Sequence, residues 1–152
     1  MPISTREARE RIVGDLGSAA EQLALGVACL GEAYEQLSVM AADRMETELY
    51  GPMQRAYGRT KRTRSQFADR VAIGVEQPPE PEPGRASQGA RAFVERAAGA
   101  ATQADGLIAD LQDTGYAIDV GDAELRAGLA EIRDLLGPVP AAARAFLRTL
   151  GR

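Results

Sequence analysis

The sequence contains no histidine, tryptophan or asparagine, and it has one cysteine, Cys29, and one lysine, Lys61. Without histidine and with a single thiol, the chain cannot build a tetrahedral zinc site or a histidine-based catalytic triad. The Glu-x-x-His pairs of ferritin-like di-iron bundles are excluded for the same reason. A glycine-rich phosphate loop is also missing. We therefore predict that the protein is not an enzyme and has no catalytic residues, metal site, cofactor or small-molecule substrate.

The sequence also lacks the features of export and of membrane insertion. A lone cysteine cannot form an internal disulfide. The N-terminal stretch MPISTREARER does not show the basic-then-apolar order of a signal peptide. The longest uncharged apolar run, residues 23 to 31, is shorter than the roughly 20 residues that span a bilayer. We predict a cytoplasmic protein without a membrane span, in which Cys29 is a small buried hydrophobic residue.

Composition indicates one soluble globular domain. The chain has 152 residues, of which 45% are hydrophobic and 26% are charged, values typical of a folded protein rather than a disordered one. The bias for arginine over lysine is typical of a bacterial genome of high GC content, so arginine is not by itself a sign of function. The net charge of −4 argues against a surface that is coated by nucleic acid.

What is present is helical periodicity, abundant alanine and few β-branched residues, which predicts an all-α fold. The stretch EQPPEPEPGR, residues 76–85, interrupts it with four prolines and favours an extended polyproline conformation. We predict a single domain over residues 1–152, an antiparallel four-helix bundle of two helical hairpins, 18–75 and 86–152. The Pro/Glu-rich linker would join the hairpins in up-down-up-down order.

The start of the first long helix has two candidate positions. Ser18 and Glu21 form a capping box, and Ser4 and Glu7 form another. Glycines at positions 14 and 17 weaken a continuous helix between them. We predict a helix over residues 18–49 that follows a short N-terminal helical arm, 4–15; the alternative is one helix that includes the arm.

The stretch Tyr50-Gly51-Pro52 predicts a tight turn before a second helix over residues 52–75. A helix, a turn and a helix over residues 18–75 resemble the hairpin of small secreted proteins of the WXG type. Tyr50-Gly51-Pro52 stands where that family has its Trp-x-Gly turn. The tryptophan is missing, the spacing differs, and residues 86–152 have no counterpart, so membership is not inferred.

Leucines spaced by seven, as in a coiled coil, predict a buried seam on the first helix: Leu16, Leu23, Leu30 and Leu37. The positions that flank this seam are mostly glycine and alanine rather than the charged residues of a two-stranded zipper. We therefore expect the seam to pack against helices of the same chain. In the second half, apolar residues keep the same spacing through Gly137 and Pro138, which predicts a kinked helix with one buried face. Asp122 is the predicted N-cap of that helix.

Two apolar residues of the predicted first helix, Leu25 and Val39, lie outside the seam. We interpret them as a candidate protein interface, covered by the N-terminal arm, by a second copy or by another protein. The function predicted from the sequence is therefore that of an interaction or structural protein that acts through protein–protein contacts and self-associates.

The alternative is a nucleic-acid-binding accessory bundle. The segment RAYGRTKRTR, residues 55–64, contains five cations and no acid. The candidate phosphate contacts are Arg55, Arg59, Lys61, Arg62 and Arg70, most of which share one helix face. A solvated helix face is the simpler interpretation of the same pattern. Arg64 and Arg44 fall inside apolar stripes instead, and we expect each to pair with a carboxylate or to extend toward solvent.

Overall fold

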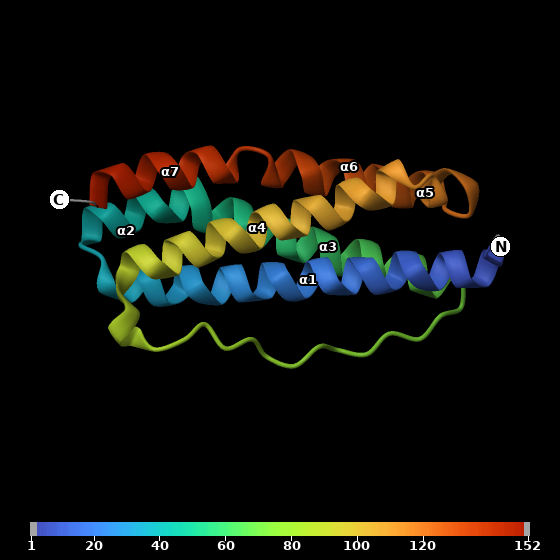
Figure 1. Cartoon of the computed structure of the whole chain (residues 1–152), viewed down its shortest axis with the longest axis horizontal. Helices are drawn as coiled ribbons and strands as arrows, with labels where there is room; N and C mark the ends of the chain where they lie inside the picture. Colours follow the sequence, from blue (N-terminus) through green and yellow to red (C-terminus); the bar gives the residue numbers. More distant parts are fainter. Residues whose placement is uncertain (1–2, 151–152) are drawn as a thin grey trace.

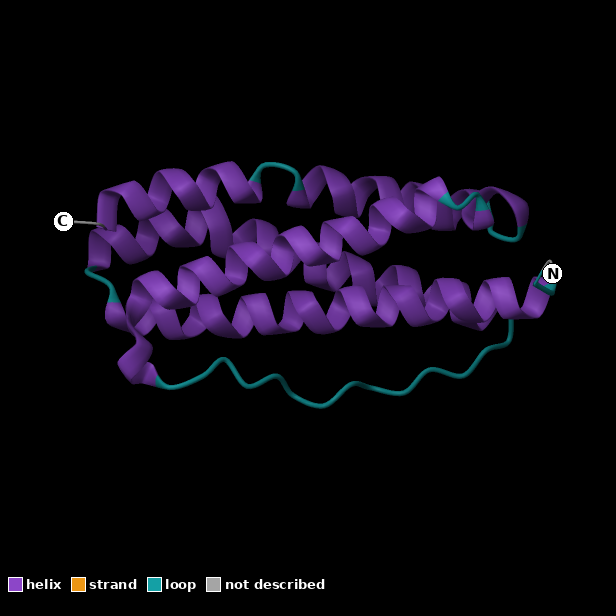
Figure 2. Ribbon diagram, viewed as in Figure 1, coloured by secondary structure: helices purple, strands orange, loops and turns teal. Residues whose placement is uncertain are grey.

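The computed structural model describes residues 3 to 150, and this part of the chain is helical and contains no strand (Figure 2). The longer helices are α1 (Thr5–Gln36), α3 (Gly51–Arg70), α4 (Gly89–Asp113), α6 (Ala123–Leu136) and α7 (Val139–Leu150). The shorter ones are α2 (Val39–Met45), the π-helix η1 (Glu46–Tyr50), the 3-10 helix η2 (Ala86–Gln88) and α5 (Tyr116–Asp119). The all-α prediction is confirmed.

The long helices lie side by side, and the start of α1 and the end of α7 lie at opposite ends of the molecule (Figure 1). Helix α1 runs antiparallel to both α3 and α4, since Arg64 of α3 bonds to Val13 while Gln36 bonds to Ala86 just before α4. Helices α3 and α4 therefore run in the same direction. This order differs from the predicted up-down-up-down course because residues 73–85 return along the length of the molecule before α4 begins.

Helix α1 is continuous from Thr5 to Gln36, so the predicted break between the arm and residue 18 is wrong. Ser4 is the N-cap, and its Oγ accepts a hydrogen bond from the Glu7 amide at 3.1 Å. Ser18 lies inside the helix. Gly17 was expected to weaken a continuous helix, but a Cβ at that position would lie 2.8 Å from the Arg64 guanidinium. The glycine makes room for a neighbouring side chain, and buried packing holds the helix through it.

The turn after the first helix lies at Leu37–Ser38, not at Tyr50-Gly51-Pro52. Ser38 caps α2, and its Oγ accepts from the Ala41 amide at 3.3 Å. The backbone stays helical through residues 45 to 52. Proline lacks an N–H for the ordinary helical bond, and the local widening into the π-helix η1 accommodates it, with the Gly51 amide bonded to Glu46. The resemblance to the WXG-type hairpin was based on a turn at Tyr50-Gly51-Pro52, and the structure has no turn there.

Helix α3 ends at Arg70 rather than near residue 75. Ala72 has a positive φ of 58°, and the Ile73 amide reaches back to the Ala68 carbonyl at 2.9 Å. This is the geometry of a Schellman C-cap with alanine in place of the usual glycine. Residues 73–85, which include the predicted linker, have no regular secondary structure.

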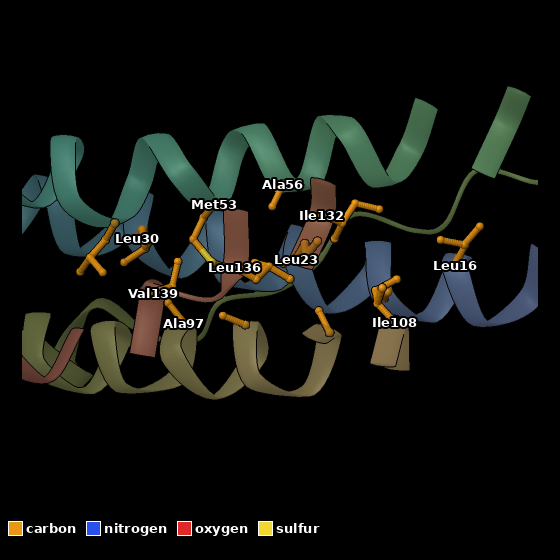
Figure 3. Close-up of a cluster of buried hydrophobic side chains, with 14 of the residues drawn as sticks. Leu16, Leu23, Leu30, Met53, Ala56, Ala97, Ile108, Ile132, Leu136 and Val139 are labelled. Atoms are coloured by element: carbon orange, nitrogen blue, oxygen red, sulfur yellow. The ribbon is translucent and has the colours of Figure 1, made fainter. Parts of the chain in front are cut away.

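The core cluster takes residues from all the long helices, from Ile12 of α1 to Phe146 of α7, and Figure 3 shows part of it. Leu16, Leu23 and Leu30 are buried as the seam predicts, and Leu37 is partly buried. The close-up also shows core residues of the other long helices: Met53, Ala56, Ala97, Ile108, Ile132, Leu136 and Val139. Helices α6 and α7 keep one buried face across Gly137–Pro138, as predicted, but a turn at these two residues divides the predicted kinked helix into two helices. Asp122 is the N-cap of α6, as predicted.

Candidate functional site

The two residues of the predicted interface do not share a helix face. Leu25 lies on α1, is partly buried and packs against the core cluster. Val39 is 78% exposed and lies on α2, beyond the turn at Leu37–Ser38. Sequence reasoning placed both on one helix because it missed that turn. Only Val39 remains as a candidate contact residue.

Val39 belongs to an exposed apolar pair at one end of the molecule. Its neighbour Met40 is 84% exposed, and Tyr34 on the last turn of α1 is 39% exposed. Two exposed carboxylates flank this pair in the sequence, Glu35 at the end of α1 and Asp43 one turn beyond Val39. Neither carboxylate takes part in an ion pair between described residues. We call Glu35, Val39, Met40 and Asp43 the α1–α2 corner.

A basic hollow lies at the same end, between α4 and α7. Its volume is about 330 Å³, and it is lined by Arg91, Arg144, Leu147 and Arg148. Arg91 comes from the first turn of α4, and its Nη2 donates to the Leu147 carbonyl at 2.7 Å. Arg144 and Arg148 stand four residues apart on α7, and no ion pair of the described chain includes either of them. We call this set the arginine hollow.

The sequence analysis predicted Val39 as a contact residue, but it recognised neither the rest of the corner nor the arginine hollow. Ser38 is a helix N-cap type, and interpreting it as a cap would have placed Val39 and Met40 in the exposed first turn of a new helix. The pair Arg144 and Arg148 is visible as like charges at helical spacing. The third arginine of the hollow, Arg91, is more than 50 positions away in the sequence, and only the packing of α4 on α7 brings it close.

The basic face of α3 is only partly available to an anion. Arg59 pairs with Glu131 of α6 at 2.6 Å, and Arg70 pairs with Asp122 and Glu124 at 2.7 and 2.9 Å. These two arginines therefore join α3 to α6. The other three predicted contacts are Arg55, Lys61 and Arg62, of which Lys61 lies over the Tyr57 ring, 4.0 Å from its centroid. Ion pairs within the described chain include none of these three.

The two arginines predicted at the core edge do not pair with carboxylates. Arg64 donates from Nε to the Val13 carbonyl at 2.9 Å and from Nη1 to the Glu76 carbonyl at 3.3 Å, so it joins α1, α3 and the start of the linker. Arg44 lies over the Phe146 ring and donates to the Thr149 hydroxyl at 2.5 Å. Main-chain carbonyl and hydroxyl oxygens accept the hydrogen bonds of these two arginines, so both arginines have structural roles.

Cys29 is buried, and the linker passes over it. Its Sγ lies 3.8 Å from the Pro83 carbonyl, which also accepts from Arg96 of α4. Burial raises the pKa of the Cys29 thiol, while the nearby Arg96 lowers it. A buried thiol with a raised pKa is a poor nucleophile at neutral pH. Cys29 therefore belongs to the packing of α1 against the linker.

Elsewhere the described residues 3–150 offer few alternatives. At the opposite end, an apolar hollow of about 200 Å³ lies beside Ile118, which is 69% exposed. No group of three or more potential metal ligands is found in this range. None of the described helices is long and apolar enough to cross a membrane, and the cytoplasmic location stays a prediction.

The chain matches no family model, no curated protein and no solved structure. Its class is therefore defined by the structure alone: an all-helical protein with an acidic, apolar corner and an arginine-lined hollow at one end.

Proposed function

We propose that the protein is an antiparallel four-helix bundle that acts through protein–protein contacts and self-associates through the α1–α2 corner. The observation that carries this proposal is the exposure of two adjacent apolar side chains, Val39 at 78% and Met40 at 84%. Single exposed apolar residues are ordinary on a protein surface. Here two stand next to each other, a few residues after the partly exposed Tyr34 and the partly buried Leu37, so burial of this corner would remove several apolar side chains from water.

The charges beside the corner favour a specific contact. Glu35 and Asp43 are exposed on either side of the apolar pair, so a partner has to offer cations around an apolar contact. A second copy of this chain carries such a surface, the arginine hollow with Leu147 among its lining residues. We therefore favour self-association over a partner of different sequence.

The change of Val39 and Met40 to glutamine tests the proposal. We expect light scattering on the wild-type protein to give a mass above 16.1 kDa that rises with concentration, because the corner is buried between copies. The double variant Val39→Gln, Met40→Gln should stay at the monomer mass with unchanged helicity, since neither side chain contributes to the core.

Ile118→Gln is the matched control, because it removes a similarly exposed apolar side chain at the opposite end of the molecule. It should associate as the wild type does. A wild-type protein that remains monomeric at high micromolar concentration contradicts self-association. If Ile118→Gln is the variant that abolishes association, the contact lies at the other end.

The nucleic-acid alternative has one supporting observation, the three cations Arg55, Lys61 and Arg62 that no ion pair of the described chain engages. It is the weaker proposal, because Arg59 and Arg70 are held by carboxylates of α6 at 2.6 and 2.7 Å. A phosphate group would have to compete with these pairs.

A further inference from the structure

We propose that the arginine hollow of one copy receives the α1–α2 corner of a second copy, so that two chains join end to end through both surfaces. This inference rests on the self-association proposed above, and it names the surface that the corner contacts. It is argued from the position, the charge and the apolar content of the two surfaces.

The corner and the hollow lie at the same end of the molecule (Figure 1). Arg44 of α2 donates to Thr149 of α7, and Gln36 at the end of α1 donates to Ala86 just before α4. These bonds hold the four helix ends together. Because both surfaces belong to one end, a two-fold axis across that end places each corner on the hollow of the other copy. The expected assembly is a closed dimer rather than an open chain of copies.

Two charges at this end, those of Glu35 and Arg91, run against the dipoles of the helices that carry them, whereas Arg148 in the last turn of α7 is favourably placed. Helix α1 ends beside Glu35 and has no basic residue in its last turn, so a carboxylate lies next to the negative end of the dipole. Helix α4 has no acidic residue in its first turn and carries Arg91 there, next to the positive end. Glu95, whose carboxylate lies 3.6 Å from Arg91, offsets part of the second arrangement, whereas no ion pair of the described residues includes Glu35. A surface of opposite charge offsets both.

The hollow has the features of a carboxylate-binding surface. Arg144 and Arg148 repel each other at four-residue spacing. Arg91 is oriented by its bond to the Leu147 carbonyl. Guanidinium groups bind carboxylates through paired hydrogen bonds, which Glu35 and Asp43 of a second copy supply. Leu147 provides the apolar contact for Met40, whose flexible side chain adapts to a shallow surface.

The contact is confined to one end of an elongated molecule, so it is smaller than a standard protein interface. An interface of this size gives a weak, reversible dimer. Charge pairs at its rim make the dimer sensitive to salt. We therefore expect the dimer to dissociate as ionic strength rises, whereas a purely apolar contact would persist.

Two charge-reversed proteins test the pairing of the surfaces. The hollow variant carries Arg144→Glu with Arg148→Glu, and the corner variant carries Glu35→Arg with Asp43→Arg. Each puts like charges on both contacts of a two-fold dimer, so each alone should have a dimer dissociation constant raised by about tenfold or more. The control is Arg55→Glu with Arg62→Glu on α3, which reverses two arginines outside both surfaces and should leave the dimer unchanged.

An equimolar mixture of the two variants should form a heterodimer. The acidic corner of the hollow variant then meets an intact arginine hollow, and the basic corner of the other variant meets a hollow that is now acidic. Sedimentation velocity at low salt should show a one-to-one complex with a dissociation constant within about threefold of the wild-type dimer. Circular dichroism verifies the helicity of each variant. If the hollow variant unfolds, Arg144→Gln with Arg148→Gln replaces it and should weaken the wild-type dimer.

Each result separates this inference from the proposed function. A wild-type protein that stays monomeric overturns both. A wild-type dimer that depends on Val39 and Met40 but tolerates both charge reversals leaves the proposed function standing and overturns the role of the hollow. Two monomeric variants that do not combine also overturn the pairing of corner and hollow.

Discussion

Single side chains connect elements that the sequence keeps far apart. The guanidinium of Arg64 bonds to α1 and to the linker, and Gly17 leaves the space for it. Asp122 has two roles as well, because it caps α6 through the Leu125 amide at 2.8 Å and pairs with Arg70 of α3. At this scale the structure depends on polar groups that each satisfy more than one partner.

Asp122→Ala should destabilise the protein more than a surface substitution does. It removes an N-cap, which typically costs about 0.5–2 kcal/mol, and leaves Arg70 with Glu124 alone. Chemical denaturation monitored by circular dichroism gives the change in unfolding free energy. Asp134→Ala on the exposed face of α6 is the control, with an expected change within about 0.5 kcal/mol. Equal losses for the two variants would show that the cap does not matter.

The same residue predicts a pH dependence. The hydrogen bond from Arg70 lowers the pKa of the Asp122 carboxyl below its usual value of 3.8, and the Leu125 amide acts in the same direction. A carboxyl whose pKa is lower in the folded state contributes stability above its unfolded pKa and loses it as pH falls through the folded pKa. The destabilising effect of Asp122→Ala should therefore be constant near neutral pH and shrink below about pH 4.

Among the elements, the proline content of the linker is explained by the distance that the linker has to span. Glu76 is held by Arg64 beside Val13, and Ala86 is held by Gln36. Along α1, the rise from Val13 to Gln36 is about 35 Å at 1.5 Å per residue. Residues 76 to 86 reach about 31 Å as polyproline and at most about 36 Å when fully extended. The linker is therefore almost fully extended. Proline favours this extended conformation, whereas a flexible sequence does not.

Shortening the linker should be much worse than lengthening it. Deletion of Glu80 and Pro81 removes about 6 Å of reach, so at least one of the two anchoring contacts has to break. We expect a loss of about 1 kcal/mol or more in unfolding free energy, measured by chemical denaturation. Insertion of Gly-Ser at the same point lengthens the loop at a small entropic cost and serves as the control. If the deletion is tolerated as well as the insertion, the linker is not taut.

At the scale of the whole molecule, charge is distributed unevenly although the net value is only −4. Carboxylates of α6 and of its N-cap neutralise part of the α3 basic face. In the arginine hollow, ion pairs of the described residues include Arg91, which pairs with Glu95 at 3.6 Å, but neither Arg144 nor Arg148. The distribution argues for contacts at the end of the molecule rather than along its side.

Nucleic-acid binding should accordingly be weak. Of the predicted phosphate contacts, only Arg55, Lys61 and Arg62 lie outside the described ion pairs. For three such contacts, the logarithm of the binding constant on duplex DNA should fall with the logarithm of the salt concentration with a slope of about −2.7. A fourfold rise in salt would weaken binding by about 40-fold. A gel-shift titration at low and physiological salt measures this. Submicromolar binding at physiological salt that is lost in Arg55→Glu, Arg62→Glu would favour the alternative function instead.

Local signals predicted the all-α class, the linker, the Asp122 cap and the buried leucine seam, because each depends on residues within a turn or two of one another. The same signals were ambiguous at Gly17 and Pro52. A glycine, which lacks a Cβ, can end a helix or leave space for a neighbouring side chain. A proline, which lacks an N–H, can end a helix or be accommodated by a wider helical turn. Which outcome holds depends on the packing around the residue. For this reason the true turn at Leu37–Ser38 was missed.

The candidate site depended on tertiary structure even more. The exposure of Val39 follows from the sequence once the turn is known, but Leu25 was assigned to the same face because the helix was taken as continuous. The arginine hollow combines Arg91 with two arginines of α7, and no periodicity links positions so far apart. Their meeting requires that α4 runs antiparallel to α6 and α7. The hollow lies at the same end as the corner because the linker returns along α1 before α4 begins, so that α3 and α4 run in the same direction.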